Sequence, residues 1–292
     1  MPARLLGLGA RMGILLVFAI FFIAPVLWLV LATTKSDKAL ITSSPFSFGS
    51  LHQVTLAWKH LNAFSDHIYR RWIENTLYYA LGATAITLVV GVPAGYGLAF
   101  GSFPGRKLVL TLTLVVMIMP AAALVLPIFL ELNSLHLIGS VLAVILPFSF
   151  FPFGVYLAYI YYATAVPRDL LDAARADGCG EWLTFRRVAL PLAKPVVALV
   201  FFFSFVADWN NFFLPYTVIA DSSQYPIQVG LSDLLSSTPS FNPAVGGGGQ
   251  QVQIFRPELA LATLLAIIPV AIVFVLSQRA LVRGLIGGAV KE

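Results

Sequence analysis

Long apolar stretches, separated by polar segments, dominate the pattern of hydrophobic and polar positions along this chain. Six stretches have about the 20 residues or more that a helix needs to cross a bilayer. They cover residues 12–34, 77–100, 108–130, 137–162, 192–217 and 259–278. The pattern predicts an all-α polytopic membrane protein with six transmembrane helices in a single transmembrane domain spanning residues 1–292.

The ends of the stretches carry further structural signals. Arg4 and Arg11 precede the first stretch as in a signal peptide, but that run exceeds the roughly 7–15 apolar residues of a signal sequence, so we interpret it as a span. Residues 35–71 are too polar to cross and predict a loop with short amphipathic helices. Asn75 is a predicted N-cap of the second span.

Two spans contain residues that interrupt a helix. Pro147 and Pro152 predict a kink in the fourth span. Residues 208–211, Asp-Trp-Asn-Asn, interrupt the fifth span with polar side chains.

Composition supports the membrane class. Hydrophobic residues make up 59% of the chain and charged residues only 11%, against about 25% charged residues in an average soluble domain. A soluble domain could not bury so much apolar surface.

The distribution of positive charge predicts the orientation. Six spans place both termini on one side, and the loops and ends on that side hold twelve of the 18 Lys and Arg residues. Because cytoplasmic segments are enriched in Lys and Arg, both termini and residues 166–191 are predicted to be cytoplasmic.

The charged segment at 166–191 has an internal pattern of its own. Residues 168–176 form an amphipathic helix after Pro167, and Gly178-Cys179-Gly180 interrupts it. Gly178 is the natural residue to adopt a left-handed conformation there. A second helix begins at Glu181 and is predicted to stop before Pro191, so that two short helices lie along the membrane surface.

This segment resembles the EAA loop of permease subunits in bacterial ABC importers. Asp172-Ala173-Ala174 occupies the E-A-A place with Asp for Glu, Gly178 the glycine, and Leu190-Pro191 the closing pair. In that family the first short helix docks into a groove of an ATPase subunit. The alternative interpretation of residues 166–191 is a loop that only connects two spans. The coupling residues that the resemblance implies are Asp172, Ala173, Ala174, Asp177, Gly178, Leu190 and Pro191.

Two more segments are similar to the MalG-like second permease of carbohydrate importers. Residues 209–212 with Pro215 match its W-N-x-F/L segment, and residues 278–291 match its Q-R-x-x-V-R-G-L-x-x-G-A-V-K tail. The ATPase-contacting tail that this implies comprises Gly287, Gly288, Ala289, Val290 and Lys291. The glycine run 246–249 is either a flexible linker or part of a loop that probes the ligand cleft of an external binding protein.

The resemblance also implies an assembly. Its members are a homologous second permease, two ATPase subunits that bind ATP and Mg, and an extracytoplasmic solute-binding protein, in the bacterial cytoplasmic membrane. This chain has no G-x-x-x-x-G-K-[ST] phosphate-binding motif. We therefore expect a permease and not an enzyme, with no cofactor, metal or nucleic acid of its own.

Asp208 is the most informative residue outside the loop. It lies about sixteen residues into a span, roughly 24 Å along a helix that rises about 1.5 Å per residue. Two environments are possible for such a carboxylate. The first is a cavity or a polar network between helices, and the second is the outer interface of the membrane. The candidate residues of the substrate pathway are Asp208, Trp209, Asn210 and Asn211.

The predicted substrate is a neutral mono- or oligosaccharide, because the spans contain no Lys or Arg deep in the bilayer. A glycerol phosphate ester or another polyol derivative is the alternative.

Two other classes of protein are less consistent with the sequence. A secondary transporter would be expected to show internal repeats and paired broken helices, and an integral-membrane enzyme would be expected to show a clustered catalytic set. The four histidines are scattered, and Cys179 is interpreted as a small turn residue.

Overall fold

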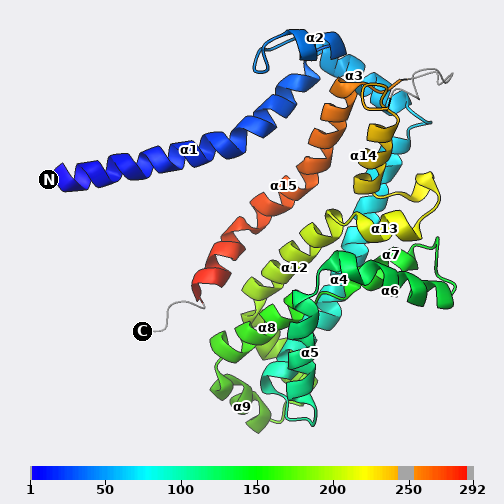
Figure 1. Cartoon of the computed structure of the whole chain (residues 1–292). Helices are drawn as coiled ribbons and strands as arrows, with labels where there is room; N and C mark the ends of the chain where they lie inside the picture. Colours follow the sequence, from blue (N-terminus) through cyan, green and yellow to red (C-terminus); the bar gives the residue numbers. More distant parts are fainter. Residues whose placement is uncertain (1, 243–252, 288–292) are drawn as a thin grey trace. The chain divides into compact units, whose positions relative to one another are not determined.

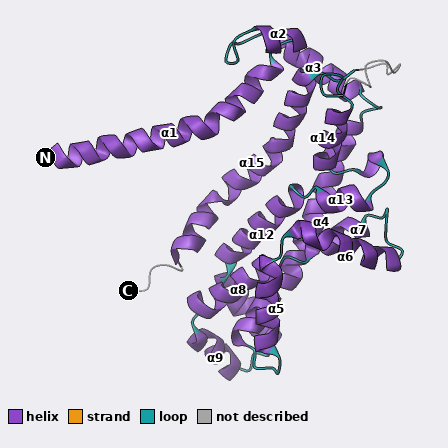
Figure 2. Ribbon diagram, viewed as in Figure 1, coloured by secondary structure: helices purple, strands orange, loops and turns teal. Residues whose placement is uncertain are grey.

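The structure is a computed structural model that describes residues 2–242 and 253–287, and these residues fold into helices and connecting loops without a β-strand (Figures 1 and 2). The predicted all-α class is confirmed. The α-helices are α1 (Pro2–Thr33), α2 (Asp37–Thr42), α3 (Leu51–Ala63), α4 (Ile68–Phe100), α5 (Arg106–Ile118), α6 (Ala121–Ser134), α7 (Leu142–Ser149), α8 (Pro152–Ala165), α9 (Arg168–Ala176), α10 (Glu181–Thr184), α11 (Leu190–Leu192), α12 (Lys194–Trp209), α13 (Phe213–Val218), α14 (Ile227–Ser236) and α15 (Arg256–Gly287). A π-helical turn, η1 (Phe185–Ala189), joins α10 to α11, and a 3-10 turn, η2 (Ser222–Gln224), precedes α14.

Helix length and hydropathy give the number of candidate spans among the described residues. Four segments are long and apolar enough to cross a bilayer alone: Arg11–Thr33, Ile68–Phe100, Leu142–Ala165 and Arg256–Arg279. Two further pairs are bent, α5 with α6 by 111° and Glu181–Leu192 with α12 by 80°. The predicted six spans are reached when each bent pair counts as one.

The helix that contains the second predicted span begins before Asn75, so Asn75 does not cap it. α4 starts at Ile68, so Asn75 lies inside the helix. Its amide nitrogen donates to the carbonyl oxygens of Ser223 and Tyr225, at 2.8 and 3.2 Å. The N-cap prediction is wrong because this side chain bonds to a distant loop and not to the backbone of its own helix.

The third predicted span, 108–130, is not one straight helix. α5 ends at Ile118 and α6 begins at Ala121. Pro120 has no backbone N–H and disfavours a helical conformation for the residue before it, and Met119 is extended, with φ −68° and ψ 132°. The chain therefore turns sharply at this proline.

The fourth and fifth predicted spans are also interrupted. The fourth breaks at Phe150–Phe151, directly before Pro152, so the kink predicted from the prolines is confirmed. In the fifth, α12 ends at Trp209 and the short α13 follows from Phe213, which leaves the predicted interruption at 208–211 at the end of a helix and not within one.

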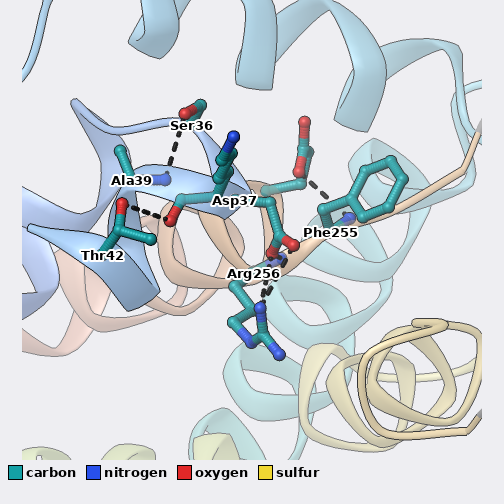
Figure 3. Close-up of polar contacts among 8 residues, drawn as sticks. Ser36, Asp37, Ala39, Thr42, Phe255 and Arg256 are labelled. Atoms are coloured by element: carbon teal, nitrogen blue, oxygen red, sulfur yellow. Dashed lines mark hydrogen bonds and ion pairs between the residues drawn. The ribbon is translucent and has the colours of Figure 1, made fainter.

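Contacts within the chain divide it into two units, residues 1–70 with 230–268 and residues 71–229 with 269–292. In the first unit, Arg256 at the start of α15 donates through Nη1 to both carboxylate oxygens of Asp37 on α2, at 3.1 Å (Figure 3). His60 on α3 lies 2.9 Å from the buried carboxylate of Glu258. These pairs tie α2 and α3 to the start of α15.

The second unit is built around close contact between helices. α8 packs against both α5 and α12 (Figure 1). α4 approaches α8 so closely at Gly95 that an added Cβ atom would lie 2.5 Å from Cβ of Ala158 and 2.8 Å from the backbone nitrogen of Tyr159. A small residue at this position permits the contact.

Candidate functional site

The charged loop forms the first part of the site, and its first helix lies where the sequence predicts it. α9 spans Arg168–Ala176 with Pro167 in the N-cap position. Gly178 has φ +85°, the predicted left-handed conformation, and the space around its missing side chain is open. The amide of Cys179 donates to the carbonyl of Ala174 at 3.0 Å and closes the turn.

The second helix of the loop runs further than predicted. It does not stop before Pro191 but continues to Leu192 through η1 and α11, where Pro191 lies in the first turn. The amide of Leu190 bonds back to the carbonyl of Phe185, five residues earlier. We attribute the continuation to this wider turn, which accommodates a residue that has no N–H of its own.

The apolar faces of both loop helices pack on the helices that enter and leave the bilayer. Leu171 of α9 and Phe185 of η1 are buried in a cluster with Tyr96 of α4 and Tyr162 of α8. The ring centroids of Tyr96 and Phe185 lie 5.1 Å apart, and the ring centroids of Tyr96 and Tyr162 lie 5.5 Å apart. The two loop helices therefore share one apolar cluster with α4 and α8.

Arg175 connects the two loop helices. Its Nη1 donates to Oδ1 of Asp172 at 2.7 Å and its Nε donates to Oε1 of Glu181 at 2.8 Å. Tyr96 of α4 donates to Oε2 of Glu181 at 3.4 Å. The hydrogen bonds from Arg175 lower the pKa of Glu181 and those to Glu181 raise the pKa of Arg175, so both groups are charged near neutral pH. Sequence reasoning missed this connection, although Arg175 and Glu181 flank the glycine turn.

The coupling residues expected from the sequence lie in two separate parts of the loop. Asp172, Ala173, Asp177 and Gly178 are exposed together on α9 and its turn, and Ala174 is half-buried. Leu170 adds an exposed apolar side chain to the same helix. Leu190 and Pro191 instead line a surface groove with Lys194 and Phe201 of α12.

Two other expectations concern residues that the structure does not describe. Gly287 ends α15, while Gly288, Ala289, Val290 and Lys291 of the expected ATPase-contacting tail lie outside the described residues. The glycine run 246–249 lies outside them as well.

Asp208 forms the second part of the site, and it belongs to an interhelix polar network. It is buried near the end of α12. Its Oδ2 accepts hydrogen bonds from Oγ1 of Thr84 on α4 at 3.2 Å and from Oγ of Ser204 at 3.3 Å. This is the first of the two environments that the sequence left open.

A cavity of about 330 Å³ lies beside this network and is lined by Asp208 and Asn211. The other two candidates do not line it. Trp209 is buried and stacks on Phe205 with 5.6 Å between ring centroids, and the amide nitrogen of Asn210 donates to the carbonyl of Val206. The sequence allowed a cavity beside Asp208 but did not predict the lining that other helices contribute, although Pro120 and Pro152 mark two of the helix breaks beside it. Among the described residues, no cluster of three His, Cys, Asp or Glu side chains could hold a metal ion.

Comparison with known proteins completes the description. A family model described as "binding-protein-dependent transport system inner membrane component" matches residues 91–287. The arabinooligosaccharides transport system permease protein AraQ of Bacillus subtilis is 36% identical over 77% of this chain and 74% of its own. The sulfoquinovosyl glycerol transport system permease protein SmoH of Agrobacterium fabrum is 30% identical over 96% of this chain and 91% of its own. The crystal structure of a bacterial ABC transporter involved in the import of the acidic polysaccharide alginate has a chain that superimposes with a TM-score of 0.80 at 21% identity, covering 96% of this chain and 97% of that one.

Proposed function

Because this chain belongs to the family of inner membrane components of binding-protein-dependent transport systems, we propose that it is the permease subunit of an ATP-driven importer for a neutral sugar. The observation that carries the proposal is the geometry of the charged loop. α9 exposes Leu170, Ala173 and Asp172, while Leu171 on the opposite face is buried against the core. A short helix of this kind can dock on a partner and transmit its motion to the helices beneath it.

This arrangement supports a mechanism of alternating access. Closure of two ATPase subunits around ATP and Mg moves α9. The loop transfers the motion to α4 and α8 through the buried cluster in which Leu171 of α9 and Phe185 of η1 lie with Tyr96 and Tyr162. Arg175 holds α9 to the second loop helix, so that the pair moves as one piece. ATP hydrolysis takes place on the separate ATPase subunits.

The complete importer requires further chains. A homologous second permease completes the translocation path, and an external solute-binding protein delivers the sugar. The tail residues Gly287, Gly288, Ala289, Val290 and Lys291 reach the ATPase subunits. Both termini lie on the cytoplasmic side of the bacterial inner membrane, the orientation that the distribution of Lys and Arg supports.

A neutral sugar is the solute that fits this chain best. The described residues that line the cavity beside Asp208 include no Lys or Arg, so a sulfonate, phosphate or carboxylate would find no cationic partner there. The relatives named above include permeases for a neutral and for an anionic glycoside. Substrate charge is therefore the property to test.

We expect the assembled importer to take up neutral oligosaccharides in preference to anionic glycosides. The test is uptake in vesicles that contain the complete importer, with arabinotriose and lactose as neutral solutes and sulfoquinovosyl glycerol and glycerol phosphate as anionic ones. Vesicles without ATP provide the control for passive leak. Exclusive uptake of an anionic solute would show that the proposed substrate class is wrong.

A further inference from the structure

One face of α4 holds the backbone of a distant turn. The side chains of Trp72, Asn75, Thr76 and Tyr79 are spaced so that they lie on the same side of this helix. All four hydrogen-bond to backbone atoms of residues 222–227, which comprise η2 and the residues that lead into α14. We refer to these four residues as the α4 clamp.

The clamp reaches four consecutive carbonyl groups of the turn. The donor and acceptor pairs are Trp72 Nε1 with the carbonyl oxygen of Ser222 (2.7 Å), Asn75 Nδ2 with those of Ser223 (2.8 Å) and Tyr225 (3.2 Å), and the Tyr79 hydroxyl with that of Gln224 (3.0 Å). The amide of Ile227 donates in the other direction, to Oγ1 of Thr76 at 2.6 Å. Because hydrogen bonds are directional, these five fix both the position and the orientation of the turn on α4.

The opposite end of α4 lies in the apolar cluster of the charged loop. Tyr96 packs there against Phe185, with 5.1 Å between ring centroids. α4 is one continuous helix, and Tyr79 lies roughly 25 Å from Tyr96 along it at a rise of about 1.5 Å per residue. A single helix therefore contacts the charged loop at one end and the turn at the other.

We infer that the α4 clamp is a set of positioning residues that makes residues 222–227 move with α4, so that α4 links the charged loop to the external face of the membrane. The inference rests on the proposed function, in whose orientation the turn is external. Asp221 and Ser222, at the start of the turn, are exposed. Because coupling between two sites is reciprocal, the same contacts carry the effect of a docked binding protein back to the ATPase subunits.

Tyr79→Phe removes one hydroxyl group of the clamp and leaves the carbonyl of Gln224 without that partner. In the assembled importer in vesicles, we expect the binding protein loaded with arabinotriose to stimulate ATP hydrolysis about threefold to tenfold less than in the wild type. Hydrolysis without the binding protein should not change. Tyr78→Phe is the matched control, because Tyr78 is the neighbouring residue of α4, is 61% exposed, and its hydroxyl group has no partner among the described residues.

Thr76→Val and Thr76→Ser separate positioning from a purely structural role. Valine has nearly the shape of threonine but cannot accept the hydrogen bond from the amide of Ile227, whereas serine can. We expect Thr76→Val to lower uptake per ATP hydrolysed about threefold to tenfold and Thr76→Ser to restore it. A purely structural role would instead lower membrane abundance and leave uptake per ATP hydrolysed at the wild-type value.

A cross-link tests the shared motion directly. In a Cys179→Ser background, Asn75→Cys with Ser223→Cys replaces a hydrogen-bonded pair of the clamp by two thiols, which a short bismethanethiosulfonate reagent can join. Loss of the Asn75 amide is expected to impair uptake, and the cross-link is expected to raise it again about threefold, because it holds the turn to α4 covalently. The single variant Asn75→Cys, treated with the same reagent, should stay impaired.

The outcomes separate this inference from the proposed function. Normal stimulation in Tyr79→Phe, an equal loss in Tyr78→Phe, or lower abundance as the sole effect of Thr76→Val would overturn the positioning role and leave the importer function intact. Loss of the remaining uptake on cross-linking would also overturn it, since the turn would then have to separate from α4 during transport. A wild-type importer without ATP-driven uptake contradicts the proposed function, whatever the clamp variants do.

Discussion

Gly178→Val is expected to reduce sugar uptake about tenfold while the protein remains in the membrane at normal abundance. Gly178 has φ +85°, and a left-handed conformation costs a β-branched residue roughly 1–2 kcal/mol. The space around the missing side chain is open, so the effect comes from the backbone and not from a clash. The turn after α9 must shift, and we expect this shift to misalign α9 with the ATPase subunit on which it is proposed to dock.

Gly180→Val is the matched control for this variant. Gly180 lies two positions further on in the same turn, but its φ of −68° and ψ of 163° are open to any residue, and its surroundings are equally free. Membrane abundance, uptake and co-purification of the ATPase are to be measured for both variants. Normal uptake by Gly178→Val, or an equal loss in both, would mean that the loop only connects two spans.

Gly95→Ala is expected to cause the largest loss of stability, although it adds a single methyl group. The new Cβ would lie 2.5 Å from Cβ of Ala158 and 2.8 Å from the backbone nitrogen of Tyr159, so α4 and α8 would have to move apart. Overpacking of this kind costs about 1–3 kcal/mol. Because the loop helices rest on these same two helices, we expect lower membrane abundance, a lower melting temperature in detergent, and reduced uptake.

Gly97→Ala serves as the control on the same helix. Gly97 is also helical, but no atom outside its chain neighbours and the nearby backbone of its own helix lies within 4 Å of the position that its Cβ would take. This variant should keep wild-type stability and uptake, with a small gain in stability from the higher helix propensity of alanine. If Gly95→Ala has normal abundance and melting temperature, the close approach of α4 and α8 does not limit stability.

Signals that act over a few residues in the sequence predicted local structure well. Pro167 and the alternation of apolar and charged residues located α9, and the glycine after it predicted the left-handed turn. The kink before Pro152 followed from the same kind of reasoning. These features depend on neighbouring residues, so the sequence contains the information that is needed to predict them.

Features that depend on distant residues could not be predicted in the same way. Asn75 has the side chain of a helix cap, but its actual partners lie about 150 residues further along the chain. Trp209 and Asn211 belong to one short motif, yet Trp209 packs against Phe205 and Asn211 lines the cavity. Hydrophobic periodicity does not specify which face of a short polar segment turns toward a cavity formed by other helices.

The central claim is that this chain hydrolyses no ATP and that its transport activity depends on ATP hydrolysis by a separate ATPase. Measurement of phosphate release tests this claim most directly. The chain is to be purified alone and together with the second permease, the ATPase subunits and the binding protein, and ATP hydrolysis is to be measured for both preparations. We predict that the ATPase co-purifies only in the second case, that hydrolysis is confined to that preparation, and that the sugar-loaded binding protein stimulates it. Comparable hydrolysis or sugar uptake by the chain alone would contradict this account.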